Sequence, residues 1–239
     1  MKKKIYYEYD EISGTYIGLE YEKYLHQSQS NYQNIEILNS KIYGNVMYLD
    51  GCFMLSEKNQ DYYHDACINI VPSSVKKILI IGGGDNAIAS MLAKSRNIKS
   101  IDVVEIDSDI IKVSKEYFPK YFKLAKQNSK KIKYIIEDGM NYVKNNKQKF
   151  DCIIIDSTDP INNAKVLFSK LFLIKCYESL KTNGVIIQQS GSPIKDRKKI
   201  IDPLKRKYIE IGYTNINLYN FPMPLYPTGT WSFIRAKRA

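Results

Sequence analysis

Short runs of neighbouring apolar residues recur through the last two thirds of the chain, within residues 78–81, 101–104, 133–136, 152–155 and 185–188. Runs without alternation are typical of parallel strands that are covered on both faces. Between them, apolar residues recur every three or four positions, as in helices with one buried side. Strands that alternate with helices predict a doubly wound α/β domain over residues 73–239.

Two helices and a hairpin can be placed more closely within this domain. One helix is expected to open at Asp85, with Ile88 and Leu92 on its buried side. Another is expected around residues 167–177, with Leu167 and Leu171 on one apolar face. The last two strands, about 214–221 and 230–236, are expected to form a hairpin.

Residues 1–72 show a different pattern, which predicts a small N-terminal antiparallel β region. Apolar and polar residues partly alternate within 16–19 and 35–38, and apolar runs at 46–49 and 52–55 flank Asp50-Gly51. A two-residue Asp-Gly between such runs is a strong hairpin signal. A sheet this small is only marginally stable on its own. We therefore expect it to pack on the main domain or on a second subunit.

Composition and charge narrow the possible functions. The 239 residues are 44% hydrophobic and carry a formal net charge of +11, which raises the question of nucleic-acid binding. However, the basic residues concentrate at 195–239, with ten Lys or Arg against three acidic residues, while acids gather near the expected strand ends. A solvated basic surface fits this distribution better, so no nucleic-acid partner is expected.

The compartment is indicated by what the sequence lacks. No apolar run reaches the length of a membrane span, and acids follow the basic N-terminus where a signal peptide needs an apolar core. The four cysteines are widely spaced and only two histidines occur, so neither a zinc site nor a disulfide framework is expected. A reducing cytoplasm, without membrane association, is the expected location.

The glycine-rich turn is the first sign of chemistry. Gly82 to Gly84 follow an expected strand at once, and Glu105 ends the next strand 21 residues beyond Gly84. This spacing is where nucleotide-binding folds hold ribose hydroxyls. A dinucleotide enzyme is one possibility, but Asp85 places a carboxylate where a pyrophosphate would lie. A cationic nucleotide, such as a sulfonium that carries an amine, fits that carboxylate better.

Five acids fall at expected strand exits: Asp85, Glu105, Asp138, Asp156 and Asp159. Several carboxylates in one cleft are costly unless a cation fills it. Each acid alone could be a helix cap. A metal would also satisfy them, but no D-x-D-x-D spacing of ligands is present, and no metal is expected.

These residues belong to a longer set of motifs: Tyr32-Gln33, LDGCFMLSEKNQDYYHD (49–65), IGGGDNA (81–87), VVEID (103–107), EDG (137–139), DCIIIDSTDPI (151–161), QSGSP (189–193) and YPTG (226–229). Through these motifs, in this order, the chain resembles the spermidine synthase family of polyamine aminopropyltransferases. The resemblance implies a Rossmann-like, class I methyltransferase-type domain after the N-terminal β region, assembled as a homodimer or homotetramer. It also implies transfer of an aminopropyl group from decarboxylated S-adenosylmethionine, the co-substrate, to putrescine, with no tightly bound cofactor.

The resemblance also implies roles for individual residues. Asp156 would accept the proton from the attacking amine, and Asp85 would receive the aminopropyl ammonium. Putrescine, with amine pKa values near those of lysine, must lose a proton before it can attack, which supports a base at this place. The amine site would comprise Tyr63, His64, Asp85, Asp159, Gln189 and Tyr226, and the nucleoside site Gln33, Gly82, Gly84, Glu105, Asp138, Gly139 and Asn163.

The chain departs from the family pattern at several positions. The family's GGGDGG reads GGGDNA here, its DPIGPA reads DPINNA, and its Tyr-His-Glu reads Tyr63-His64-Asp65. These changes put closure over the nucleoside and the preferred amine length in doubt. Three alternatives remain open: another amine acceptor, methyl transfer from S-adenosylmethionine as in putrescine N-methyltransferases, and a non-catalytic protein that binds polyamines or nucleosides.

Overall fold

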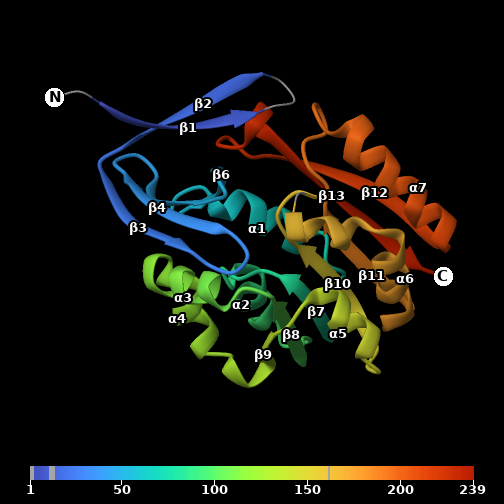
Figure 1. The fold of residues 1–239 in the computed structure, drawn as a ribbon. Helices are drawn as coiled ribbons and strands as arrows, with labels where there is room; N and C mark the ends of the chain where they lie inside the picture. The colour runs from blue at the N-terminus through green and yellow to red at the C-terminus, as the bar shows by residue number, and fades with distance from the viewer. Residues whose placement is uncertain (1–2, 11–13, 161) are drawn as a thin grey trace.

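The computed structural model describes residues 3–10, 14–160 and 162–239. Ile161, the last residue of the DCIIIDSTDPI motif, lies outside the described residues. A seven-stranded sheet forms the centre, in the order β12-β13-β11-β10-β7-β8-β9 (Figure 1). Five strands are parallel: β7 (Lys77–Gly82), β8 (Ser100–Glu105), β9 (Ile132–Ile136), β10 (Phe150–Asp156) and β11 (Leu180–Gln189). The C-terminal hairpin β12 (Tyr213–Pro222) and β13 (Thr230–Arg238) is added antiparallel, as expected from the sequence.

Helices cover both faces of this sheet, and the absence of alternation in the strands follows from that burial. In β7, Ile78 and Ile80 pack with helices on one face, whereas Leu79 and Ile81 pack with helices on the other. The first face carries α1 (Gln60–Asn69), α2 (Ala87–Ala93) and α4 (Pro119–Lys126), and the second carries α5 (Gly139–Asn145), α6 (Lys170–Ser179) and α7 (Asp202–Ile211). Short helical turns lie at Ser129–Lys131, Asn162–Phe168, Arg197–Ile201 and Pro227–Gly229.

The N-terminal region forms two antiparallel sheets. The hairpin β1 (Lys4–Asp10) and β2 (Thr15–Tyr21) lies above a four-stranded sheet of β3 (Lys23–Gln29), β4 (Asn34–Ser40), β5 (Gly44–Leu49) and β6 (Cys52–Ser56) (Figure 1). Asp50 and Gly51 connect β5 to β6 with φ of 48° and 79°, the backbone that a two-residue primed turn requires, so the predicted hairpin is confirmed. The four-stranded sheet packs on α3 (Ser108–Tyr117).

Two helix predictions were wrong in detail. The helix expected to open at Asp85 begins at Ala87, because Asn86 adopts left-handed backbone with φ of 65°. The apolar face expected around residues 167–177 is broken, because Ser169 starts a new helix: its Oγ accepts a hydrogen bond from the Phe172 N–H. The helical phase shifts there, so Phe172 is buried while Leu171 is 50% exposed. None of the helices formed by the described residues is both long and apolar enough to cross a membrane.

Candidate active site

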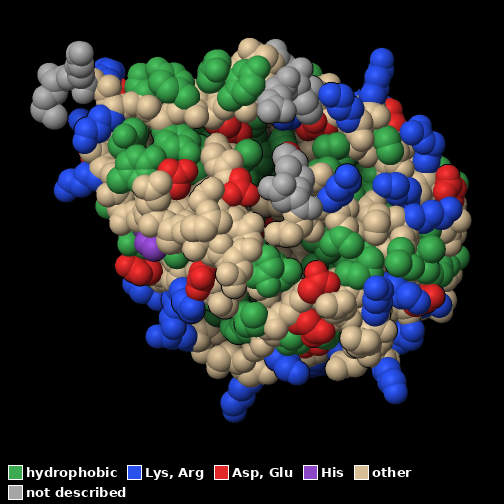
Figure 2. All heavy atoms as spheres, viewed as in Figure 1, with side chains coloured by type: hydrophobic (Ala, Val, Ile, Leu, Met, Phe, Trp, Pro, Cys, Tyr) green, Lys and Arg blue, Asp and Glu red, His purple; other side chains and the backbone are tan. Residues whose placement is uncertain are grey.

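A cavity of about 880 Å³ opens at the carboxyl ends of the parallel strands, and residues of β1, β5 and β6 of the N-terminal region also line it. Figure 2 shows acidic side chains beside a hollow near the centre of one face, whereas Lys and Arg side chains lie mostly around the edge of the molecule in this view. Every site residue expected from the sequence lines this cavity: Gln33, Tyr63, His64, Gly82, Gly84, Asp85, Glu105, Asp138, Gly139, Asp156, Asp159, Asn163, Gln189 and Tyr226. The tertiary structure therefore brings all of them together.

The glycine turn after β7 is dictated by the close approach of its neighbours. Gly82 has φ of +85°, and a Cβ there would lie 1.9 Å from the carbonyl oxygen of Asp156. A Cβ on Gly84 would lie 2.5 Å from Ile110 and 3.3 Å from Glu105 Oε2. Side chains at these two positions would therefore collide with the end of β10 and with Ile110, so the turn that lines the cavity requires residues without a Cβ.

Glu105, at the end of β8, is held in a network that ties the N-terminal sheet to the central sheet. Its Oε1 accepts a hydrogen bond of 2.9 Å from the Asp107 N–H. The Asp107 side chain in turn accepts hydrogen bonds from Ser30 Oγ (2.7 Å) and Gln33 Nε2 (3.0 Å). Burial raises the pKa of Glu105 to about 7, although the hydrogen bond from Asp107 N–H opposes this. Asp107 thus holds two cavity-lining residues, Gln33 and Glu105, in place. The sequence reasoning gave it no such role, although it ends the VVEID motif.

Three further residues of the expected nucleoside site line the cavity near the ends of β9 and β10. Asp138 is the N-cap of α5, where its Oδ1 accepts a hydrogen bond of 2.9 Å from the Asn141 N–H. Gly139 has no room for a side chain, since a Cβ would lie 2.6 Å from Ile81 Cγ2. Asn163 Nδ2 lies 3.4 Å from the Tyr32 carbonyl oxygen. The helix-cap interpretation therefore holds for Asp138, which also faces the cavity.

Asp85 and His64 form a buried pair. His64 Nε2 lies 2.8 Å from Asp85 Oδ2, and their side chains are 4% and 12% exposed. Asp85 Oδ1 also accepts a hydrogen bond from the Ala87 N–H. Burial is the largest single effect and disfavours both charges, but the charge of each partner and the hydrogen bond between them, with smaller contributions from neighbours, together outweigh it. The pKa of Asp85 is therefore lowered and that of His64 is raised. His64 Nδ1 is buried without a hydrogen-bond partner among the described residues.

Asp156, the last residue of β10, pairs in register with Gly82 and lies next to the glycine turn. The buried Tyr63 of α1 donates a hydrogen bond of 2.7 Å from its hydroxyl to Asp156 Oδ1. Burial, followed by the charge of Asp85, raises the pKa of Asp156 to about 6, while Tyr63 and His64 oppose the rise. The side chain is therefore a carboxylate at neutral pH that can take a proton at little cost.

Beyond Asp156, the cavity is lined by aromatic residues, amides and further acids. Tyr226 donates its hydroxyl to the Met54 carbonyl oxygen at 2.9 Å. Gln189 is held at both ends of its amide: its Nε2 donates to the Thr158 carbonyl oxygen, and its Oε1 accepts hydrogen bonds from Trp231 Nε1 and the Gly191 N–H. Burial and the nearby Asp196 raise the pKa of Asp159 to about 6.

This end of the cavity also contains residues that the sequence reasoning missed, namely Glu8, Asp10, Lys195, Asp196 and Trp231. Glu8 and Asp10 share one face of β1 by the two-residue alternation of a strand, which is a signal the sequence did contain. Nothing in the sequence pattern of β1 shows, however, that this face covers the cavity. No group of three His, Cys, Asp or Glu side chains among the described residues is arranged to hold a metal ion.

The sheet order, the glycine turn and the acids at the strand ends define a protein of the Rossmann-like, class I methyltransferase type, with a cleft lined by acidic side chains. Residues 50–239 match the spermine/spermidine synthase domain, and residues 6–57 match the spermidine synthase tetramerisation domain. The chain therefore belongs to the spermine/spermidine synthase family, as the motifs indicated.

Individual relatives agree with this family. The chain is 32% identical over 236 residues to a polyamine aminopropyltransferase of Alkaliphilus metalliredigens. The matched region covers 96% of this chain and 81% of the relative. It is 33% identical to the enzyme of that name from Methanocaldococcus jannaschii, over 90% of this chain and 73% of the relative.

Solved structures are similar along almost the whole chain. A spermidine synthase in complex with the transition-state analogue AdoDATO superposes with a TM-score of 0.87 at 29% identity, over 99% of this chain and 80% of that one. The spermidine synthase from Thermotoga maritima gives a TM-score of 0.85 at 28% identity, over 99% and 79%. The expected fold class is confirmed.

Proposed function

We propose that this protein is an aminopropyltransferase that transfers the aminopropyl group of decarboxylated S-adenosylmethionine to putrescine, giving spermidine and methylthioadenosine. The observation that carries the proposal is the position of Asp156. This carboxylate lies beside the glycine turn, is held by Tyr63, and has Asp85 on one side and Asp159 three residues further along the chain. A dication with amines at both ends, next to a sulfonium that also carries an amine, matches that set of charges.

The nucleoside would lie over the glycine turn and the ends of β8 and β9. Glu105 would accept hydrogen bonds from the ribose hydroxyls, and Gly82 and Gly84 leave room for the nucleoside. Asp138 and Gly139 would face the adenine, and Gln33 and Asn163, which also line the cavity, would help to hold the nucleoside. The network through Asp107 supports this assignment, because it fixes Gln33 and Glu105 relative to each other.

Asp85 would hold the ammonium of the aminopropyl group. An ammonium beside Asp85 favours loss of the proton from His64, since two cations would otherwise compete for one carboxylate. His64 would then still donate Nε2–H to Asp85. The same carboxylate would repel the carboxylate of ordinary S-adenosylmethionine, which favours the decarboxylated donor.

Asp156 would act as the base. One amine of putrescine gives a proton to Asp156, and its nitrogen then attacks the aminopropyl carbon next to the sulfonium. As the new N–C bond forms, the C–S bond breaks and its electron pair stays on sulfur, which leaves neutral methylthioadenosine. The far ammonium would be held by Asp159, with Tyr63, Gln189 and Tyr226 shaping the channel. Positioning of the two substrates supplies much of the rate.

Three wider assignments complete the proposal. The exposed Tyr7, Tyr9 and Tyr16 form an aromatic surface on the β1–β2 hairpin, which supports assembly into a homodimer or homotetramer. Residues 1–72 would form the N-terminal β region and 73–239 the catalytic domain. A cytoplasmic location fits the four free cysteines.

A mass-spectrometric turnover assay tests the function. The protein is supplied with decarboxylated S-adenosylmethionine and putrescine, cadaverine, agmatine or spermidine, and in parallel with ordinary S-adenosylmethionine. Methylthioadenosine together with an amine that has gained an aminopropyl group supports the proposal, and the best acceptor defines the specificity. A methylated amine would instead assign methyl transfer. Binding of methylthioadenosine without any product would leave a non-catalytic binding protein.

A further inference from the structure

A lysine side chain lies inside the cavity, at the end proposed to receive the far ammonium of the acceptor. Lys195 follows β11, and its side chain is only 13% exposed. Its Nζ lies 3.2 Å from Oδ1 of Asp10, whose side chain is 5% exposed and which ends β1 of the N-terminal hairpin. A lysine ammonium in a cavity that would bind cationic amines is unexpected, because it repels them.

The carboxylates around Lys195 differ in how far they are already engaged. Glu8 Oε2 accepts a hydrogen bond from the Phe53 N–H, and Asp196 Oδ2 accepts one from the Ser192 N–H. Asp10 has the ion pair with Lys195. Asp159 receives only a long contact of 3.5 Å from Gln189 Nε2 within the described part of the chain. Asp159 is thus the carboxylate most available to a ligand, while Lys195, which lines the same cavity, is paired with Asp10 of the hairpin.

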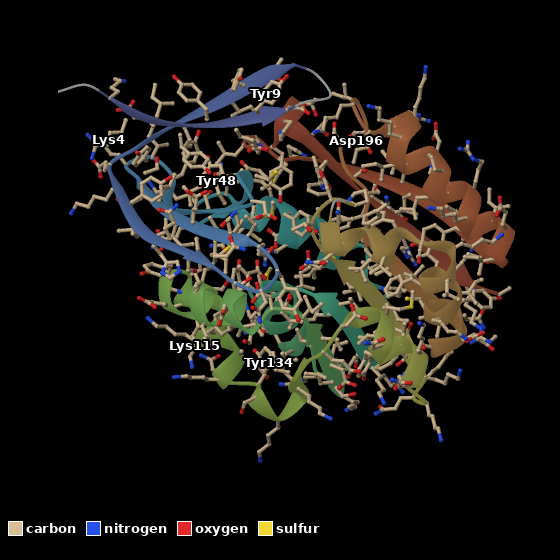
Figure 3. All side chains as sticks on the ribbon, viewed as in Figure 1. Lys4, Tyr9, Tyr48, Lys115, Tyr134 and Asp196 are labelled. Atoms are coloured by element: carbon tan, nitrogen blue, oxygen red, sulfur yellow. The ribbon has the colours of Figure 1, made fainter. Side chains whose placement is uncertain are left out.

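The electrostatic coupling of these groups agrees with the geometry. The charge of Lys195 opposes the rise in pKa that burial causes at Glu8, Asp159 and Asp196. Figure 3 shows Asp196 near one end of the hairpin that carries Tyr9. The charge of Lys195 therefore favours the ionised form of Glu8, Asp159 and Asp196. Its ion pair with Asp10 also connects the segment after β11 to the N-terminal hairpin.

We propose that Lys195 determines acceptor specificity: its ammonium occupies the far end of the acceptor channel, so that the channel takes a diamine and rejects amines that carry a further ammonium. This inference rests on the proposed function. A diamine places its second ammonium at Asp159, whereas a triamine would bring a third cation toward Lys195. Like charges in a partly buried site repel strongly, and such repulsion is an effective means of discrimination.

The variant Lys195→Met tests the inference, because methionine keeps the apolar length of the side chain without its charge. We expect kcat/KM for spermidine, relative to that for putrescine, to rise about 10- to 100-fold. Lys198→Met is the matched control, since Lys198 is exposed three residues away and loses the same charge. A ratio that stays within about twofold of the wild type in Lys195→Met would overturn the proposal.

A second variant, Asp10→Asn, keeps the inference testable should Lys195→Met fold poorly. Without the Asp10 carboxylate, Lys195 keeps its charge and turns toward Asp159, so the dissociation constant for putrescine is expected to rise about tenfold. An unchanged constant would contradict the proposal. Calorimetric titration of putrescine and spermidine into all variants, with methylthioadenosine present, gives the same comparison without turnover. A wild type that transfers no aminopropyl group would therefore refute the function but leave the role of Lys195 to be decided by binding.

Discussion

Replacing Tyr63 by phenylalanine removes one atom, the hydroxyl that donates a 2.7 Å hydrogen bond to Asp156. Hydrogen bonds to charged groups contribute about 1.5–3 kcal/mol, which corresponds to a pKa change of roughly 1–2 units. The hydroxyl lowers the pKa of Asp156, which lies at about 6 with the hydrogen bond in place. In Tyr63→Phe the pKa should therefore rise to roughly 7–8.

The sign of the pH effect follows from the role of the base. Asp156 must be ionised to accept a proton, so kcat/KM is lost as pH falls through its pKa, and a higher pKa moves this acid limb to higher pH. At pH 7 the ionised fraction should fall from about nine tenths to between about one half and one tenth. Near pH 9 Asp156 is ionised in both proteins, so any loss that remains there measures how the hydrogen bond orients the carboxylate.

The assay is the pH profile of kcat/KM for putrescine between about pH 5.5 and 9. Tyr62→Phe is the matched control: it lies on the same helix, is 48% exposed, and should leave the profile unchanged. An acid limb at the same pH in Tyr63→Phe and wild type would refute the reasoning. It would mean either that Asp156 is not the base or that Tyr63 does not tune it.

Four further outcomes are expected. Asp156→Asn should reduce turnover at least about a hundredfold while calorimetry finds methylthioadenosine binding nearly unchanged; near-normal turnover would remove Asp156 from the mechanism. Glu105→Gln should weaken methylthioadenosine binding about tenfold, and an equal dissociation constant would exclude the ribose role. Gly82→Ala should reduce the free energy of unfolding, measured in urea, by at least about 3 kcal/mol, because the added Cβ would collide with the Asp156 carbonyl. Gly229→Ala, at a residue with φ of +67° but no atom within 4 Å of the added Cβ, should reduce it by only about 1–2 kcal/mol. Equal losses in the two variants would argue against the collision. Burial raises the pKa of Asp159 from 3.8 to about 6, so the stability that its protonated form contributes is fully present below about pH 4 and is lost as pH rises through 6. Putrescine, which would bind the ionised carboxylate, should therefore stabilise the protein more at pH 7 than at pH 5, and the increase should be smaller in Asp159→Asn. A stabilisation by putrescine that does not depend on pH would count against this reasoning.

The order of strands and helices could be predicted from the sequence, because it depends on local patterns. Buried parallel strands need neighbouring apolar residues, and the glycine turn after β7 needs residues without a Cβ. The acids at the ends of β7, β8 and β10 could be placed at one edge of the sheet, because parallel strands share that edge. Errors arose where a local feature set the start of a helix: the left-handed backbone of Asn86, and the side-chain cap that Ser169 forms.

The contacts between the site residues could not be predicted in the same way. Tyr63 and Asp156 are 93 residues apart, and Lys195 and Asp10 are 185 residues apart. The sequence by itself therefore determined which side chains are available for chemistry and at which strand ends they lie. Only the tertiary structure decided that His64 pairs with Asp85, that Tyr63 holds Asp156 and that Lys195 lines the cavity. Each of these pairs is formed by packing of distant elements, and the free energy of that packing is not encoded in any local pattern.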